Sequence, residues 1–249
     1  MKKILFLLLL VTLTMNAQSV DRLFSKANKL YKMEQYQAAI DMYKTIESEH
    51  MISSDVYYNL GNSYYKLNKV GPAIFYYEKA LQLNPDNEDV KNNLIFARRL
   101  ALDNIKPLPK TIWQKINENY LQRLTYNEWA IVVVLFSLAA GLLFLLYYFN
   151  NTTSKKRLFF VTSLIAFIGL LVSLTITYKQ YNYIKNTKEA IVFSAKSDIR
   201  NAPTLNAEKV FTLHEGTKVF VLDAVDNWKK IKIADGKLGW IIASEIREF

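Results

Sequence analysis

Two uncharged apolar segments constrain this chain more than any other feature of its sequence. They cover residues 129–149 and 158–178, and each contains 21 residues without a single charge. An α-helix rises about 1.5 Å per residue, so about 20 apolar residues cross the ~30 Å hydrocarbon layer of a bilayer. A buried hairpin in a soluble protein is the alternative, but core helices rarely stay free of charge for this length. We therefore interpret both segments as transmembrane helices.

The loop between these segments indicates how they are oriented. It consists of residues 150–157, which are too few to form a domain. It contains Lys155, Lys156 and Arg157, and short loops rich in lysine and arginine stay on the cytoplasmic side of a membrane. Two crossings then place everything before residue 129 and everything after residue 178 outside the cytoplasm.

The basic balance of the chain is explained by these membrane segments. The formal net charge is +10, yet residues 20–104 carry eleven basic and eleven acidic residues, and residues 188–249 carry ten and nine. The excess lies beside the apolar segments, where lysine and arginine set orientation and contact anionic headgroups. We therefore expect membrane lipid as a partner and no nucleic acid.

The residue inventory argues against an enzyme. The sequence has no cysteine and two histidines, His50 and His214, in different segments. Disulfides, thiolate catalysis and cysteine metal sites are excluded, and a histidine base or metal ligand would lack its usual neighbours. We expect no catalytic residue, no metal and no cofactor.

Residues 1–17 have the features of a secretory signal peptide. Two lysines follow the first methionine, an apolar run extends from Ile4 to Met15, and Ala17 precedes a polar residue. The run is too short to span a bilayer comfortably, so cleavage after Ala17 is expected. An uncleaved anchor is the alternative, and in both cases the residues that follow are exported.

After this leader the sequence repeats itself at a fixed period. Residues 20–53 align with residues 54–87, so that Tyr43 coincides with Tyr77. The second unit carries the residues typical of a tetratricopeptide repeat, namely Tyr57, Leu60, Gly61, Tyr64, Ala73, Tyr77, Ala80 and Pro85. The resemblance implies an all-α repeat stack over residues 20–104.

The small residues of the repeat have a mechanical role. Gly61 and Ala73 have almost no side chain, so the two helices of the second unit can approach closely there. Residues 88–104 predict a further helix without a partner of the same pattern. We interpret it as the polar-faced cap that repeat stacks need.

Tetratricopeptide stacks bind extended peptides in a groove lined by the first helix of each repeat. By pattern position, the resemblance places these residues in the groove: Phe24, Asn28, Tyr31, Tyr58, Asn62 and Tyr65. A clamp for a terminal carboxylate would use Asn28 and Asn59, but its basic positions hold Phe24, Asp89 and Asn93. An aromatic groove for an apolar or extended protein segment fits better. The alternative is a stack that packs against the membrane part of its own chain.

Residues 105–128 form a linker and an amphipathic segment before the first apolar helix. Pro107 and Pro109 interrupt helical structure. After them, apolar residues recur at helical spacing: Ile112, Trp113, Ile116, Tyr120 and Leu124. We expect this segment to lie on the membrane surface, and docking under the repeats is the alternative.

The C-terminal residues change to short β-type runs broken by turns. Residues 179–187 are expected to be a polar connector, and residues 188–249 contain the runs. Sequence words at 198–203, 213–217 and 235–241, together with Trp228, resemble a bacterial SH3 domain. The resemblance implies an SH3-like barrel that recognises cell-wall peptides or other proteins.

Three side chains of this region are expected to have different roles. Trp228 is the predicted ligand-binding residue, with burial in the core as the alternative. Trp240 is expected in the core, because large aromatic residues are mostly packing residues. His214 lies at a turn and is expected to be solvated.

The order of these parts, a leader, repeats, two apolar helices and an SH3 domain, resembles the BatE-type aerotolerance proteins. These are encoded beside von Willebrand factor A-type membrane proteins and a MoxR-type ATPase. The resemblance implies a multidomain protein of the bacterial inner membrane that joins other membrane proteins in one complex.

Three classes of function follow from this organisation. The first is a membrane-bound scaffold that binds protein partners through its repeats. The second is a cell-wall sensor or tether whose SH3 domain binds peptidoglycan. The third is an enzyme, which the residue inventory disfavours because wall peptidases need a cysteine nucleophile or a metal cluster.

Overall fold

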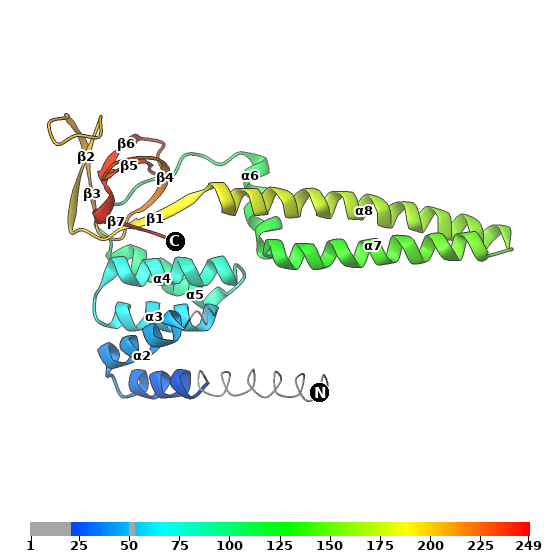
Figure 1. The fold of residues 1–249 in the computed structure, drawn as a ribbon, viewed down its shortest axis with the longest axis horizontal. Coiled ribbons are helices and arrows are strands. Elements are labelled where there is room, and N and C mark those ends of the chain that lie inside the picture. Colours follow the sequence, from blue (N-terminus) through cyan, green and yellow to red (C-terminus); the bar gives the residue numbers. More distant parts are fainter. Residues whose placement is uncertain (1–20, 50–52) are drawn as a thin grey trace, which may run out of the picture. The chain divides into compact units, whose positions relative to one another are not determined.

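The computed structural model describes residues 21–49 and 53–249 (Figure 1). The predicted signal peptide lies outside the described residues. The chain divides into two compact units, one made of the chain up to Leu108 together with Lys188–Phe249, the other of Pro109–Thr187. The first unit therefore joins segments from both sides of the apolar helices.

The N-terminal part of the first unit is a stack of antiparallel helices. A helix over residues 21–32 is followed by α2 (Tyr36–Ser48), α3 (Ser54–Lys66), α4 (Val70–Leu83) and α5 (Glu88–Leu100). The side chains of Ser53 and Asn87 cap α3 and α5 by accepting hydrogen bonds from backbone N–H groups in the first turn. Glu34 and Asn68, at equivalent positions of the two repeats, both adopt positive φ in the turns that reverse the chain.

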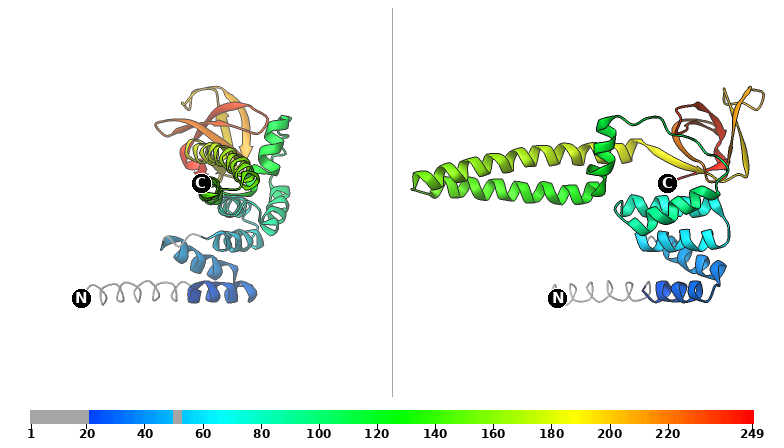
Figure 2. Two further views of the ribbon diagram at one scale, coloured as in Figure 1. Left: turned by 90° about the vertical axis from the view of Figure 1, so that its right-hand side faces the viewer. Right: turned by 180° about the vertical axis from the view of Figure 1, so that it is seen from behind.

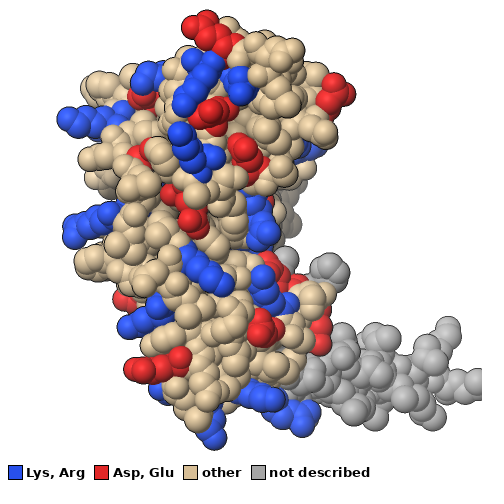
Figure 3. All heavy atoms as spheres, turned by 90° about the vertical axis from the view of Figure 1, so that its left-hand side faces the viewer, with Lys and Arg blue, Asp and Glu red and all other residues tan. Residues whose placement is uncertain are grey.

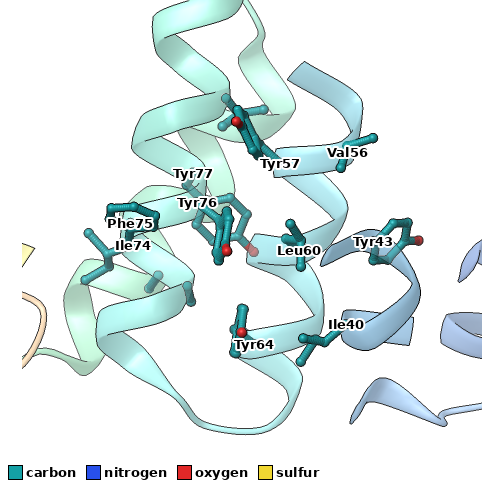
Figure 4. Close-up of a cluster of buried hydrophobic side chains, with 14 of the residues drawn as sticks. Ile40, Tyr43, Val56, Tyr57, Leu60, Tyr64, Ile74, Phe75, Tyr76 and Tyr77 are labelled. Atoms are coloured by element: carbon teal, nitrogen blue, oxygen red, sulfur yellow. The ribbon is translucent and has the colours of Figure 1, made fainter. Parts of the chain in front are cut away.

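The close approach of the two helices in the second repeat is confirmed. A Cβ placed on Gly61 of α3 would lie 2.5 Å from two ring carbons of Tyr77 on α4, and Ala73 is fully buried. The surrounding core is rich in tyrosine, and Tyr57, Tyr64 and Tyr76 are all buried within it (Figure 4). The Tyr77 ring thus occupies the space that a side chain at position 61 would fill.

The outer face of the capping helix is less polar than expected. Val90, Leu94 and Ala97 of α5 face the stack, as a cap requires. Ile95, Phe96 and Leu100 are about half exposed, so apolar side chains also lie on the outer surface.

The C-terminal part of the first unit is an antiparallel β domain. Its strands are β1 (Lys188–Val192), β2 (Lys196–Arg200), β3 (Lys209–His214), β4 (Lys218–Val225), β5 (Trp228–Lys232), β6 (Leu238–Ile242) and β7 (Ile246–Glu248). Among the described residues they form one sheet in the order β3-β2-β6-β5-β4-β1-β7. Ile199, Ile231 and Ile241 are fully buried in its core. Gly216 and Gly236 adopt positive φ, as expected for the turns that they occupy.

The repeats and the β domain share a hydrophobic core. Ile191 of β1 is buried in the same cluster as the repeat residues. The ring of Phe75 on α4 makes edge contacts with Phe193 and Phe249, each with centroids 5.6 Å apart. Sequence patterns predict separate domains for these parts, but the two are packed together on α4.

A buried ion cluster joins the same two parts. The Glu78 side chain on α4 is 8% exposed and lies 2.9 Å from Lys218 Nζ of β4 and 2.5 Å from an Arg98 nitrogen of α5. Lys218 Nζ also lies 2.7 Å from the Glu189 carboxylate. Burial acts to raise the pKa of Glu78, but the charges of Lys218 and Arg98 outweigh it and hold the pKa below its usual range. The buried Glu78 carboxylate is therefore compensated by Lys218 from the β domain and by Arg98 from the capping helix.

The segment after α5 crosses the β domain as a strap. Asp103 accepts hydrogen bonds from the backbone N–H of His214 (2.6 Å) and the Thr217 hydroxyl (2.6 Å), and it lies 2.7 Å from the His214 ring nitrogen Nδ1. Further along, the Leu108 N–H donates to the Ala234 carbonyl at 3.1 Å. The expectation that His214 is merely solvated is therefore wrong, because its turn is held by Asp103.

The second unit contains the apolar helices. Its elements are α6 (Ile112–Asn119), the short 3-10 helix η1 (Leu121–Arg123), α7 (Tyr126–Phe149) and α8 (Thr153–Asn186). In the described part of the chain, α7 and α8 are the two helices long and apolar enough to cross a membrane. They lie side by side (Figures 1 and 2).

Small residues line the contact between these two helices. The Ser163 hydroxyl on α8 donates to the Ala140 carbonyl on α7 at 3.1 Å, and Gly169 faces the ring of Phe136. Both helices extend beyond the charge-free segments. The residues expected to form a connector, 179–187, are almost entirely the last turns of α8.

Candidate protein-binding face

The candidate binding residues lie on the first helix of each repeat and on the cap. We call the surface formed by the side chains of residues 21–32, α3 and α5 the first-helix face. The structure places all six predicted groove residues on this face and leaves each of them partly buried: Phe24, Asn28, Tyr31, Tyr58, Asn62 and Tyr65. Their role in binding stays a prediction.

In the first repeat, a tyrosine and two asparagines form a hydrogen-bonded group. The hydroxyl of Tyr43 on α2 donates to the Asn28 side-chain oxygen Oδ1 at 2.6 Å. The Asn59 amide nitrogen on α3 donates to the same oxygen at 3.0 Å. Burial raises the pKa of Tyr43, so its hydroxyl stays protonated as a donor.

The second repeat contains the same group at the equivalent positions. The Tyr77 hydroxyl donates to Asn62 Oδ1 at 2.7 Å, and the Asn93 amide nitrogen on α5 donates to that oxygen at 2.8 Å. Asn93 also donates to the Tyr58 hydroxyl at 3.1 Å. Because each member recurs one repeat later, this hydrogen-bonded Asn–Tyr–Asn group is a property of the repeat.

These bonds determine which polar atoms a partner can reach. The side-chain oxygens of Asn28 and Asn62 each accept two hydrogen bonds, which leaves their amino groups as donors. Conversely, Asn59 and Asn93 use their amino groups and keep their oxygens as acceptors. Within the described residues, none of these four remaining groups makes a side-chain hydrogen bond. The first-helix face therefore presents donors and acceptors in a repeating order.

Aromatic rings flank these amides at the same period. Phe24 lies 6.0 Å from Tyr43, and Tyr58 lies 6.2 Å from Tyr77, centroid to centroid. Tyr31 makes an edge contact of 5.3 Å with Tyr36. Tyrosine and phenylalanine give a large contact area at a small cost in side-chain entropy.

Sequence reasoning identified most of these residues but not how they are connected. From the sequence, Asn59 and Asn93 are assigned only to positions of a carboxylate clamp. These two asparagines are separated by one full repeat period, as are Tyr43 and Tyr77, and that shared spacing is the signal that could have revealed the group.

The aromatic residues of the β domain are buried in the reverse of the expected order. Trp228 at the start of β5 is 9% exposed, whereas Trp240 on β6 is only partly buried. The ligand role predicted for Trp228 stays a prediction, and it would require a ring with little free surface to contact a ligand.

Charges of both signs are interspersed over the first unit. On the face shown in Figure 3, lysine and arginine alternate with aspartate and glutamate, and the described residues form no broad basic patch there. In the described part of the chain, no group of three or more acidic residues and histidines could hold a metal ion.

Comparison with known families supports the assignment of both parts of the first unit. Residues 54–87 match the family model of the tetratricopeptide repeat, and residues 196–247 match that of the bacterial SH3 domain. No curated protein matches the chain. Both families are typically interaction domains without catalytic activity. The predicted fold class is confirmed: the chain combines a helical repeat region, two long apolar helices and a C-terminal all-β domain similar to bacterial SH3 domains.

Proposed function

We propose that this chain is a non-catalytic, membrane-anchored scaffold that binds an extended segment of a partner protein on its first-helix face. The observation that carries this proposal is the repeated Asn–Tyr–Asn group, which presents amide donors and acceptors between aromatic rings. An extended segment offers backbone N–H and C=O groups in alternation, so side-chain amides can pair with it whatever its sequence.

The packing of the first unit supports the choice of this face. The β domain packs on α4, the second helix of its repeat, through Phe75 and Glu78. Side chains of the first helices and the cap are therefore left for a partner. A stack of this size offers a small contact area, so we expect a weak contact that confinement to the same membrane strengthens.

The second unit supports the anchoring part of the proposal. Helices α7 and α8 are long and apolar enough to cross a bilayer, and Lys155, Lys156 and Arg157 follow their connection. The proposed location is the bacterial inner membrane, with repeats and β domain outside the cytoplasm. The proposed partners are membrane proteins of a Bat-type complex.

The test is co-purification from native membranes. Tyr58→Ala combined with Asn62→Ala removes a ring and an amide from the first-helix face, and we expect the bound proteins to be lost. Tyr65→Ala is a milder variant, because it removes a ring but leaves both Asn–Tyr–Asn groups intact. Asn92→Ala is the matched control, since this exposed residue lies beside Asn93 on α5.

Helix content and membrane insertion must be unchanged for the result to count. If folded double-variant protein still co-purifies with every wild-type partner, the first-helix face is not the binding site.

A second candidate function is a cell-wall sensor or tether, which the match of residues 196–247 to the bacterial SH3 family favours. Purified peptidoglycan would then sediment the full chain in detergent. Trp228→Phe keeps an aromatic ring in the core and tests whether the indole contributes to this binding. Absence of sedimentation by the wild-type chain would exclude this candidate.

A further inference from the structure

Helix α6 carries an apolar face that the other described residues of the second unit leave exposed. Trp113 is 80% exposed, Ile112 76% and Tyr120, directly after the helix, 67%. At about 100° per residue, Ile112, Ile116, Tyr120 and Trp113 fall within one arc of roughly 100°. The helix is well formed, because Thr111 and Gln114 cap its N-terminus reciprocally. An ordered helix thus presents a large aromatic ring and an isoleucine to its surroundings.

The connection from α6 to the apolar helices is fixed by hydrogen bonds. The carbonyl oxygen of Leu121 accepts from the Trp129 indole N–H on α7 at 2.9 Å and from the Gln180 amide on α8 at 2.6 Å. Tyr126 and Tyr181 make an edge contact with centroids 5.9 Å apart. The residues that follow α6 are therefore tied to the start of α7 and to the last turns of α8.

These contacts also locate the end of the hairpin relative to a bilayer. Trp129, Tyr126, Tyr178 and Tyr181 gather where α7 begins and where the apolar part of α8 ends. Tryptophan and tyrosine are enriched at the boundary between lipid and water. Since Leu121 accepts a hydrogen bond from the Trp129 indole, the C-terminal end of α6 lies near the same boundary.

We infer that the apolar face of α6 lies in the lipid–water interface at this end of the hairpin. The inference rests on the proposed membrane anchoring. The bilayer covers this face of α6, because the face continues from two helices that are apolar on their outer surfaces. The side chains of Ile112, Trp113 and Tyr120 enter the boundary of headgroups and acyl chains, and Lys115 lies off the apolar arc toward water. Helix α6 then fixes the depth of this end of the hairpin in the interface.

The test uses single cysteines, which the cysteine-free sequence makes simple. Ile112→Cys reports the apolar face, Lys115→Cys is the matched control on the same helix, and Leu138→Cys reports the middle of α7. Each variant of the full chain is spin-labelled and reconstituted into nanodiscs of phosphatidylcholine and phosphatidylglycerol. Collisional accessibility to oxygen and to a water-soluble nickel chelate is then measured.

We expect the label at 112 to lose most of its accessibility to the nickel chelate while it remains accessible to oxygen. The label at 115 should stay accessible to the chelate, and the label at 138 should be reached by oxygen alone. If the labels at 112 and 115 are equally accessible to the chelate while that at 138 is in lipid, the inference is overturned and the anchoring stands.

Two further outcomes also decide the question. A label at 112 that neither reagent reaches would mean that protein covers α6, which overturns the inference in favour of docking under the repeats. A label at 138 that the chelate reaches would overturn the membrane anchoring, and the inference with it.

Discussion

At the scale of single residues, the repeat depends on one position where a side chain is absent. Gly61 has ordinary helical backbone geometry, so its role is spatial: the Tyr77 ring occupies the volume that a Cβ would need. Tyr77 in turn supplies the hydroxyl that orients Asn62 on the first-helix face. A core position is thereby coupled to the candidate binding residues.

Gly61→Ala should therefore destabilise the repeats by about 1–3 kcal/mol, the usual cost of overpacking a close-packed core. The Tyr77 ring would have to move, and the second Asn–Tyr–Asn group would lose its geometry. Thermal unfolding of the full chain in nanodiscs, followed by circular dichroism, measures the effect. Gly141→Ala on α7 is the control, because its Cβ would meet no atom within 4 Å. Equal unfolding temperatures for both variants would show that α3 and α4 can separate without cost.

At the scale of elements, strand positions decide how the tryptophans of the β domain are used. Trp228 opens β5 and pairs with Val225 on β4 and Ile242 on β6, in the middle of the sheet order. Trp240 pairs with Arg200 of β2 and Lys230 of β5 and keeps more of its surface accessible. The sequence motifs predict the order of the two tryptophans along the chain, but they do not predict which of the two rings is more deeply buried.

Trp228→Ala should accordingly cost about 3–5 kcal/mol, as expected for removal of a large buried ring. Trp240→Ala should cost less, because its partly exposed ring leaves a smaller cavity. Far-ultraviolet circular dichroism of the full chain during thermal unfolding compares the two variants. A larger loss for Trp240→Ala would place the main aromatic packing on β6 instead.

Local patterns in the sequence predicted the elements better than the contacts between them. The repeat period predicts the helices of both repeats, because each repeat specifies its own packing, and it places the six groove candidates on the first helices. The charge-free segments gave α7 and α8, although the helices continue past those segments, where polar residues such as Lys179 and Gln180 still favour helix.

What local pattern could not give was the interface between the repeats and the β domain. Glu78 and Lys218 lie 140 positions apart, and nothing near either residue marks it as buried. Balanced charges are typical of a solvated surface. In the sequence, the residues of the ion cluster therefore cannot be distinguished from ordinary surface charges. Asp103 and His214 were unpredictable for the same reason.

At the scale of the whole molecule, the interface between the repeats and the β domain makes the stability of the first unit depend on pH. Burial acts to raise the pKa values of Glu78 and Asp103, but Lys218 and Arg98 for the first, and hydrogen bonds from Thr217 and His214 for the second, lower both values. A carboxyl whose pKa is lowered by folding adds stability above its unfolded pKa. That stability is lost as the pH falls through the folded pKa.

The unfolding temperature of the first unit should therefore fall as the pH drops below about 4, the usual carboxyl range. Glu78→Gln should lower stability near neutral pH by about 2 kcal/mol, less than loss of a fully buried ion pair, because the Arg98 side chain is half exposed. It should also make the acid dependence shallower. The measurement is thermal unfolding of both proteins in nanodiscs from neutral to acidic pH. Identical pH profiles would mean that Glu78 does not contribute to the acid dependence.

Labelling of single cysteines tests the proposed orientation of the whole chain. Asn84→Cys and Thr204→Cys lie at exposed positions of the repeats and the β domain, and Ser154→Cys lies in the first turn of α8. In cells with a permeabilised outer layer, an impermeant thiol reagent should modify the first two and spare the third. Modification at 154 with protection at 84 and 204 would reverse the orientation.

The shared core of the first unit has a consequence for how the chain reaches its final state. Its two halves are separated in the sequence by the hairpin, yet Phe75 before the hairpin packs on Phe193 and Phe249 after it. If the hairpin enters a bilayer, these halves can meet only when the number of crossings between them is even. In a chain with one helix not inserted, the repeats and the β domain would lie in different compartments. Phe75 and Glu78 would then be uncovered. In a membrane, this core could therefore close only in molecules whose two helices had both inserted, and only after the β domain that follows them had been made.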